Sequence, residues 1–256
     1  MTSFARRNSL LLYFLLTFAW FWGCLALGSF NRFRFWVPIL GALAPGLAAV
    51  VVSGVSEGEH EIRALLRRLA QWRVGSVWYL IALGLPIAEN LFIVGVAILR
   101  GLFSIARVPP VLPVLPALWL AYLFAAGEEL GWRGFALPRL LATRTGLAAS
   151  LILGAVHAVW HWPLILLPHQ WLSGVPLVPY TAFVVSEAIV FTWIFQNTRG
   201  SALLATLFHG SSNAAMLFYD GIDPAWGPWL KSSTSVLVAL AVLLRAGPHL
   251  KRAQPS

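Results

Sequence analysis

Two adjacent glutamates, Glu128 and Glu129, follow an apolar run that ends near Ala126, and Arg133 comes four residues after the second of them. An ionisable side chain at bilayer depth costs about 2.5–3.5 kcal/mol on insertion scales, so such residues usually mark a function. Consecutive helical residues point about 100° apart, whereas residues four apart share a face. The spacing therefore predicts that Glu129 pairs with Arg133, and it leaves Glu128 as a candidate general base.

Two further apolar segments carry polar side chains at helical spacing. His157 and His161 are four residues apart and precede Pro163, and His209 and Asn213 are also four apart. Imidazole and amide groups on one helix face can stabilise an oxyanion, and imidazoles also bind metals. A single membrane histidine is about as often a hydrogen-bond partner of a neighbouring helix. Three such clusters on three segments favour catalysis over three separate structural contacts.

The elements that carry these residues are predicted to lie in a membrane. The chain of 256 residues is 59% hydrophobic and 11% charged, with a mean hydropathy of +0.78, whereas soluble domains have about 25% charged residues. A soluble core would have to hide nearly every apolar residue. The net charge of +9 does not indicate nucleic-acid binding here, because the basic residues cluster between apolar stretches, where they set topology and meet anionic lipid.

Eight apolar stretches are long enough to approach the roughly 30 Å of a bilayer core at 1.5 Å per helical residue. The sequence therefore predicts an all-α, polytopic integral membrane bundle of about eight transmembrane helices, in a bacterial or archaeal cell membrane. The stretches fall near residues 10–27, 35–54, 77–99, 113–131, 147–167, 178–197, 201–218 and 232–246.

The distribution of basic residues predicts the orientation of this bundle. With eight crossings and the N-terminus inside, most of the 18 Lys and Arg residues lie on the inside, as cytoplasmic loops prefer. Both termini are therefore predicted to be cytoplasmic. The five basic residues left on the outside are Arg32, Arg34, Arg100, Arg107 and Lys231.

The chain shows no internal repeat and no linker, so residues 1–256 are predicted to form one membrane-embedded domain. Its polar clusters all fall within residues 113–218, which we expect to be a catalytic core. Residues 1–112 are expected to supply scaffold helices. Within them, the mixed-charge segment near 57–73 has leucines at helical spacing and predicts a short amphipathic helix on the cytoplasmic surface.

The ordered motifs resemble those of the CPBP family of intramembrane proteases, also called the CAAX protease and bacteriocin-processing (Abi) family. The likeness covers about residues 113–218, close to half of the chain. Three patterns carry it in order: E-E-x-x-x-R, an aromatic-rich H-x-P, and H-x-x-x-N. They stand here as Glu128-Glu129 with Arg133, His161 with Pro163, and His209 with Asn213.

The resemblance implies an intramembrane endopeptidase that hydrolyses a peptide bond in a membrane-anchored peptide or protein. On this hypothesis Glu128 and His161 bind and deprotonate the attacking water, and His209 and Asn213 stabilise the tetrahedral oxyanion. Glu129 and Arg133 would be structural support. The hydrated chamber that such a site needs is expected to open to the cytoplasmic side, near the loop of Arg139 and Arg144.

A metal-dependent mechanism stays open beside a glutamate-type one. Members of the family are often described as metalloproteases, and Glu128, His161 and His209 would make a zinc site with an open fourth position. His157 stands where the family usually has Phe or Trp, which raises a second metal alternative, the pair His157 and His161. Zinc helices normally place a carboxylate between such histidines, and none stands here.

Two other functions compete with proteolysis. A proton-coupled transporter would also place ionisable groups in membrane segments, and Glu89 and Glu187 add such groups elsewhere. The polar clusters nevertheless concentrate in one half of the chain. A catalytically inactive immunity or scaffolding protein of the same fold is the other alternative, although every motif position carries its functional residue.

Overall fold

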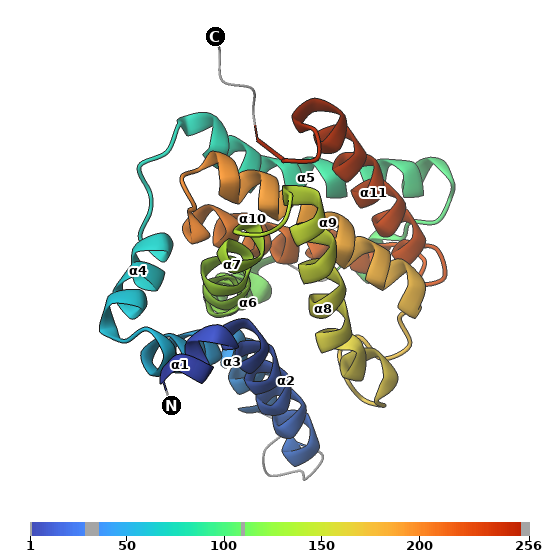
Figure 1. Ribbon diagram of the computed structural model, residues 1–256. Coiled ribbons are helices and arrows are strands. Elements are labelled where there is room, and N and C mark those ends of the chain that lie inside the picture. Colours follow the sequence, from blue (N-terminus) through green and yellow to red (C-terminus); the bar gives the residue numbers. More distant parts are fainter. Residues whose placement is uncertain (1, 29–35, 109–110, 252–256) are drawn as a thin grey trace.

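A computed structural model describes residues 2–28, 36–108 and 111–251, and this part of the chain is built from helices (Figure 1). All eight predicted stretches lie on long helices. In chain order these are α2 (Ser9–Gly28), α3 (Trp36–Ser56), α5 (Ser76–Leu99), α6 (Val111–Gly131), α8 (Gly146–Leu166), α9 (Leu177–Asn197), α10 (Ala202–Ala215) and α11 (Gly227–Ala246).

Short helices connect these long ones. The connecting elements are α1 (Thr2–Arg7), α4 (Glu59–Leu69), η1 (Ile105–Arg107), η2 (Trp132–Ala136), α7 (Leu137–Leu141) and η3 (Met216–Gly221). Among the described residues, α2, α5, α8, α9 and α11 are long and apolar enough to cross a membrane. The prediction of a polytopic helical membrane protein is confirmed. The clearest difference from the eight predicted crossings is at α10, whose 14 residues reach only about 21 Å.

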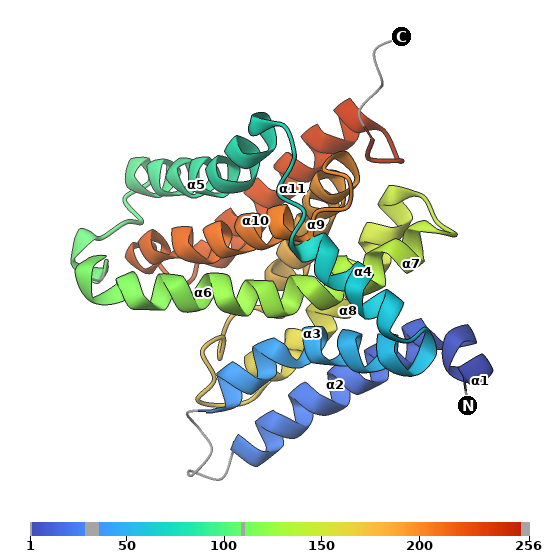
Figure 2. The same cartoon turned by 90° about the vertical axis from the view of Figure 1, so that its left-hand side faces the viewer.

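Helix α1 and the C-terminal end of α11 lie at the same end of the bundle, the right-hand end in Figure 2. The short helices α1, α4 and α7 gather at this end, and the connection between α5 and α6 lies at the other. This arrangement agrees with an even number of crossings and with basic helices on one side. That this side is cytoplasmic stays a prediction, and the outer residues Arg32 and Arg34 lie outside the described residues.

Glycines bring α6 into backbone contact with α3. A Cβ atom on Gly46 would lie 2.6 Å from the carbonyl oxygen of Gly127, and one on Gly131 would overlap the backbone of Pro45. Close helix approach at small residues four positions apart is common in membranes, where packing replaces the hydrophobic effect between helices. Because Gly127 and Gly131 flank the two glutamates, this contact sets the rotation of the helix that carries them.

The other two site-bearing helices are also held by glycines. On α10, a Cβ at Gly210 would overlap the ring of Tyr122 from α6, and the Tyr122 hydroxyl hydrogen-bonds to Ser211 Oγ at 2.9 Å. On α8, a Cβ at Gly154 would lie 2.9 Å from Val185 Cα on α9. These contacts place α10 against α6, and α8 against α9, at the level of the polar clusters.

Substituting Gly131 with Ala should destabilise the protein because the added methyl group has no space against Pro45. Overpacking of this kind typically costs about 1–3 kcal/mol. The measurement is the midpoint of thermal unfolding in detergent. Gly84→Ala on α5 is the matched control, since nothing lies within 4 Å of its Cβ position and only helix propensity changes. Equal midpoints for the two variants would contradict a tight α3–α6 contact.

The predicted amphipathic helix is present as α4, and it packs on the segment that follows the glutamates. Leu65 is fully buried, and its Cδ1 atom would lie 2.9 Å from a Cβ on Gly134. Arg68 donates a hydrogen bond to the Gly134 carbonyl at 3.0 Å, and Arg139 forms an ion pair with Glu57 at 2.8 Å. The helix therefore braces the end of α6 as well as lying at the surface.

Candidate active site

Glu129 and Arg133 form a fully buried ion pair, as their spacing predicts. Arg133 Nη1 donates to Glu129 Oε1 at 2.8 Å, and the two side chains are 1% and 0% exposed. The Arg133 guanidinium also lies over the ring of Phe191 from α9, 3.7 Å from its centroid. The charge of Arg133 is thus satisfied by one carboxylate and one aromatic face.

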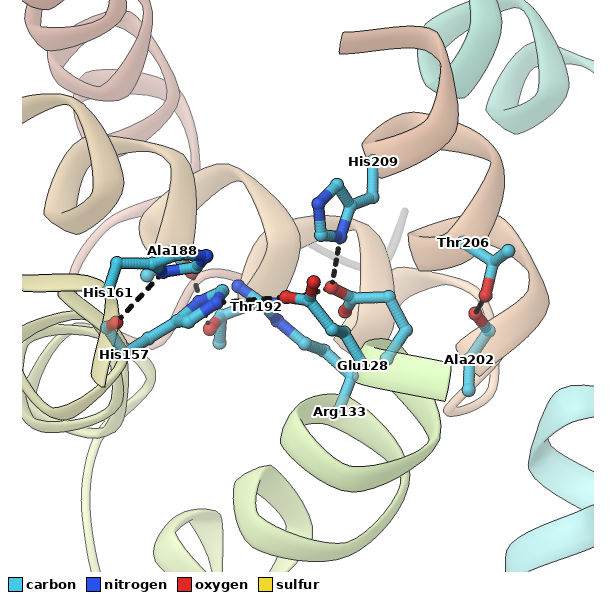
Figure 3. A network of polar contacts seen from close by, with 10 residues as sticks. Glu128, Arg133, His157, His161, Ala188, Thr192, Ala202, Thr206 and His209 are labelled. Carbon is cyan, nitrogen blue, oxygen red and sulfur yellow. Dashed lines mark hydrogen bonds and ion pairs between the residues drawn. The ribbon is translucent and has the colours of Figure 1, made fainter. Parts of the chain in front are cut away.

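Glu129 has a second partner that the spacing could not show. His209 Nδ1 from α10 lies 2.8 Å from Glu129 Oε1, the same oxygen that accepts from Arg133 (Figure 3). Because that carboxylate accepts from Arg133, the His209 ring donates through Nδ1, which leaves Nε2 for the cavity beyond it. Glu129 therefore contacts both Arg133 in its own motif and His209 in the H-x-x-x-N motif, so it does more than pair with Arg133.

The turn after α6 is a π-helix, η2, and all five of its residues are buried. A single π-helical turn shifts the helical phase and occurs often at functional sites. Here it carries Arg133 back under Glu129 and packs Trp132 against His157, with ring centroids 4.8 Å apart. The Trp132 ring thereby fixes one face of the imidazole.

Glu128 points toward α8, and its direct contact is His157. The distance from Glu128 Oε2 to His157 Nε2 is 3.2 Å, and both residues are buried (Figure 3). His161 lies next to this pair and donates through Nδ1 to the His157 carbonyl at 3.2 Å. His157 was not in the predicted catalytic set, although its four-residue spacing from His161 was a usable signal.

The predicted zinc ligands Glu128, His161 and His209 do not come together. Among the described residues, the group close enough to hold a metal is Glu128, His157 and His161, whose ligand atoms lie within 4.8 Å of one another. The reason is the angle of about 100° between adjacent helical residues. Glu128 faces α8 while Glu129 faces α10, so His209 goes to the other carboxylate.

All four residues of the predicted catalytic set nevertheless line one cavity of about 640 Å³, namely Glu128, His161, His209 and Asn213. Asn213 is exposed along this surface, one turn after His209. The rest of the wall is mainly apolar and aromatic, including Phe124, Leu164, Phe183 and Phe191. An apolar chamber with a few convergent polar groups is the usual form of a ligand site.

The cavity extends toward the end of the bundle opposite the termini. Its lining includes Gln170 and Trp171 between α8 and α9, and Tyr219 and Asp220 in η3; in Figure 2 the connection from α8 to α9 lies at the left. Arg139 and Arg144 are not among the lining residues, and an opening beside their loop stays a prediction.

The two remaining membrane glutamates have different surroundings. Glu89 on α5 forms a buried ion pair with Lys231 of α11 at 3.1 Å and a hydrogen bond with Ser235. Such a pair joins two helices and needs no transport function. Glu187 on α9 lines the cavity beside the catalytic candidates. Glu187 was not in the predicted catalytic set, and nothing in its spacing marked it.

Comparison with known proteins finds similarity over nearly the same residues as the predicted catalytic core. Residues 110–215 match the family model described as type II CAAX prenyl endopeptidase Rce1-like. A curated relative, CAAX prenyl protease 2 of Methanococcus maripaludis, is 31% identical over 101 residues. This part of the chain is similar to the CPBP family. The CPBP match nearly coincides with the predicted core of 113–218 and includes every motif residue.

The CPBP likeness is confined to the core. The aligned residues cover 37% of this chain and 37% of the curated relative, so the chain spans little more than a third of that protein. Helices α1 to α5 and α11 lie outside the matched CPBP segment. The matched model is that of a protease family, and the matched segment contains all three motifs.

Proposed function

We propose that this protein is an intramembrane endopeptidase that hydrolyses a peptide bond in a membrane-anchored peptide or protein. The observation that carries the proposal is the arrangement of Glu128 beside two imidazoles on the wall of a cavity that His209 and Asn213 also line. A water held at Glu128 has a base on one side and hydrogen-bond donors across the chamber, as amide hydrolysis requires.

In this mechanism Glu128 takes a proton from water as the water oxygen attacks the carbonyl carbon. His161 helps to hold that water, and His157 orients Glu128 through the 3.2 Å contact. The oxyanion accepts hydrogen bonds from His209 Nε2 and the Asn213 amide. The carbon–nitrogen bond then breaks, and the proton carried by Glu128 passes to the leaving amine. Glu129 keeps His209 in place.

A divalent metal remains a second form of the same proposal. One carboxylate oxygen and two imidazole nitrogens from Glu128, His157 and His161 are a suitable donor set for zinc. A bound zinc ion supplies Lewis-acid activation of water. In that form His209 and Asn213 keep the same task on the opposite wall.

Substituting His157 with Phe, the residue type usual at this place in the family, should lower the cleavage rate by about 10- to 100-fold. The reason is the loss of a hydrogen bond to a charged group, worth about 1.5–3 kcal/mol. The measurements are peptide cleavage in liposomes and zinc content by elemental analysis. Unchanged cleavage would contradict a role for His157 in orienting Glu128.

The same samples distinguish the two forms of the mechanism. Stoichiometric zinc in the wild type that is lost in both His157→Phe and Glu128→Gln would support the metal form. Full activity after chelation, with no zinc bound, would exclude it.

The substrate is best sought in membranes. We propose comparing the membrane proteomes of cells that contain the wild type, the Glu128→Gln variant or no copy of the protein. The expected result is a truncated membrane-anchored species that only the wild type produces, and prenylated proteins are the first class to inspect, given the name of the relative. Identical proteomes in the three strains would contradict proteolysis. Ion-driven uptake in liposomes that survives Glu128→Gln would instead support a transporter.

A further inference from the structure

Glu187 differs from the other buried membrane glutamates in its lack of a partner. Glu89 pairs with Lys231, Glu129 with Arg133, and Glu128 with His157. Glu187 is 5% exposed, and in the part of the chain that the structure describes it has neither an ion pair nor a hydrogen bond through its carboxyl group. A buried carboxylate without a partner is costly, so its retention calls for a function.

The wall around Glu187 is suited to cations. Phe183 and Phe191 lie one turn before and one turn after it on α9, and all three line the cavity. Each ring already meets a cation on one side: the Lys231 ammonium lies 5.0 Å from the Phe183 centroid, and the Arg133 guanidinium 3.7 Å from that of Phe191. Both cations form ion pairs with other carboxylates, Lys231 with Glu89 and Arg133 with Glu129, and neither is in ion-pair contact with Glu187 among the described residues.

The buried side chains around the cavity include more carboxylates than permanent cations, which favours binding of a further cation. In the described interior, four carboxylates stand against the two permanent cations Arg133 and Lys231. Asp220 adds another carboxylate to the cavity lining near the end opposite the termini. A positively charged group that enters this chamber would be attracted electrostatically and by the aromatic faces, while its aliphatic stem would contact apolar wall.

We propose that Glu187 is a specificity residue that selects substrates with a lysine or arginine side chain close to the scissile bond. The basic group would pair with the Glu187 carboxylate while the peptide carbonyl lies between Glu128 and His209, which line the same chamber. This inference rests on the proposed proteolysis, and it names the substrate class that the site takes.

Cation binding can be measured without any substrate. The probes are dodecylguanidinium and the neutral dodecylurea, which have the same chain length, bound to the purified full chain in lipid nanodiscs. The guanidinium should bind about tenfold more tightly than the urea to the wild type, as a charge-assisted pair predicts. Glu187→Gln should abolish that difference with an unchanged unfolding temperature. Glu59→Gln is the control, because Glu59 is an exposed glutamate on α4.

Equal binding of the two probes to the wild type would overturn the inference. So would a preference for the guanidinium that survives Glu187→Gln, since another carboxylate would then hold the cation.

Cleavage of a peptide pool tests the selectivity itself. The pool consists of acyl-anchored peptides with randomised residues in liposomes, and mass spectrometry reads the products. The wild type should enrich Lys and Arg at one position near the cut. Glu187→Gln should lose the enrichment, and Glu187→Lys should shift it toward Asp and Glu.

The outcomes separate this inference from the proposed function. Cleavage that needs Glu128 but shows no basic preference would overturn the selectivity and leave proteolysis standing. An absence of any Glu128-dependent cleavage would count against proteolysis and therefore against selection of a substrate.

Discussion

Substituting Glu128 with Gln is expected to reduce peptide-bond cleavage by about 10²–10⁴-fold, the usual contribution of a positioned general base. The amide has the same shape as the carboxyl group and can still hydrogen-bond to His157, so the fold should be unaffected. It cannot accept a proton from water. The measurement is the initial rate on the membrane-anchored species found in the proteome comparison, with both proteins reconstituted at equal density in liposomes.

The matched control for this prediction is Glu59→Gln, which makes the same chemical change at an exposed position on α4. It should cleave at the wild-type rate. A Glu128→Gln variant that retained more than a tenth of the wild-type rate would contradict the assignment of the base. A loss of rate accompanied by a lower unfolding temperature would point to a structural role.

Relations within one helix could be predicted from the sequence, and relations between helices could not. The pairing of Glu129 with Arg133 follows from residues four apart on one face, and the structure has it at 2.8 Å. The choice of His157 as the partner of Glu128 depends on how α8 rotates against α6. The rotation of α8 is also constrained by its contact with α9 at Gly154 and Val185, which no spacing in the sequence reveals.

In the fold too, single helices could be predicted from the sequence, whereas the packing between them could not. Long apolar stretches predict helices because a bilayer leaves the backbone no other partners, and every predicted stretch lies on a helix. The π-turn at η2 and the direction of the cavity depend on tertiary packing. The docking of α4 on the segment after the glutamates, through Leu65 and Arg68, also depends on tertiary packing.

The adjacent glutamates share one helical turn but make two separate sets of contacts. Glu128 faces the histidines of α8, and Glu129 faces Arg133 and the histidine of α10. One pair of residues thereby sets the distance between the proposed base and the proposed oxyanion donor. Close contacts of Gly127 and Gly131 with α3 hold that turn, so the geometry of the site depends on the packing of a helix that carries none of its chemistry.

Substituting Glu129 with Leu should destabilise the protein by about 3–5 kcal/mol, because it leaves the buried guanidinium of Arg133 without its counter-charge. It should also abolish cleavage, since His209 loses the carboxylate that holds its ring. The measurements are the thermal unfolding midpoint in detergent and the cleavage rate in liposomes. The double variant Glu129→Leu with Arg133→Met separates the two effects.

In the double variant both members of the buried ion pair are replaced, so the Arg133 charge is no longer left unpaired. Much of the lost stability should return, as it does when buried ion pairs are replaced by apolar residues. Cleavage should stay low because nothing restores the anchor of His209. Recovery of both stability and cleavage would show that Glu129 serves only to neutralise Arg133. Recovery of stability alone would support Glu129 as the link between the ion pair and the oxyanion side of the cavity.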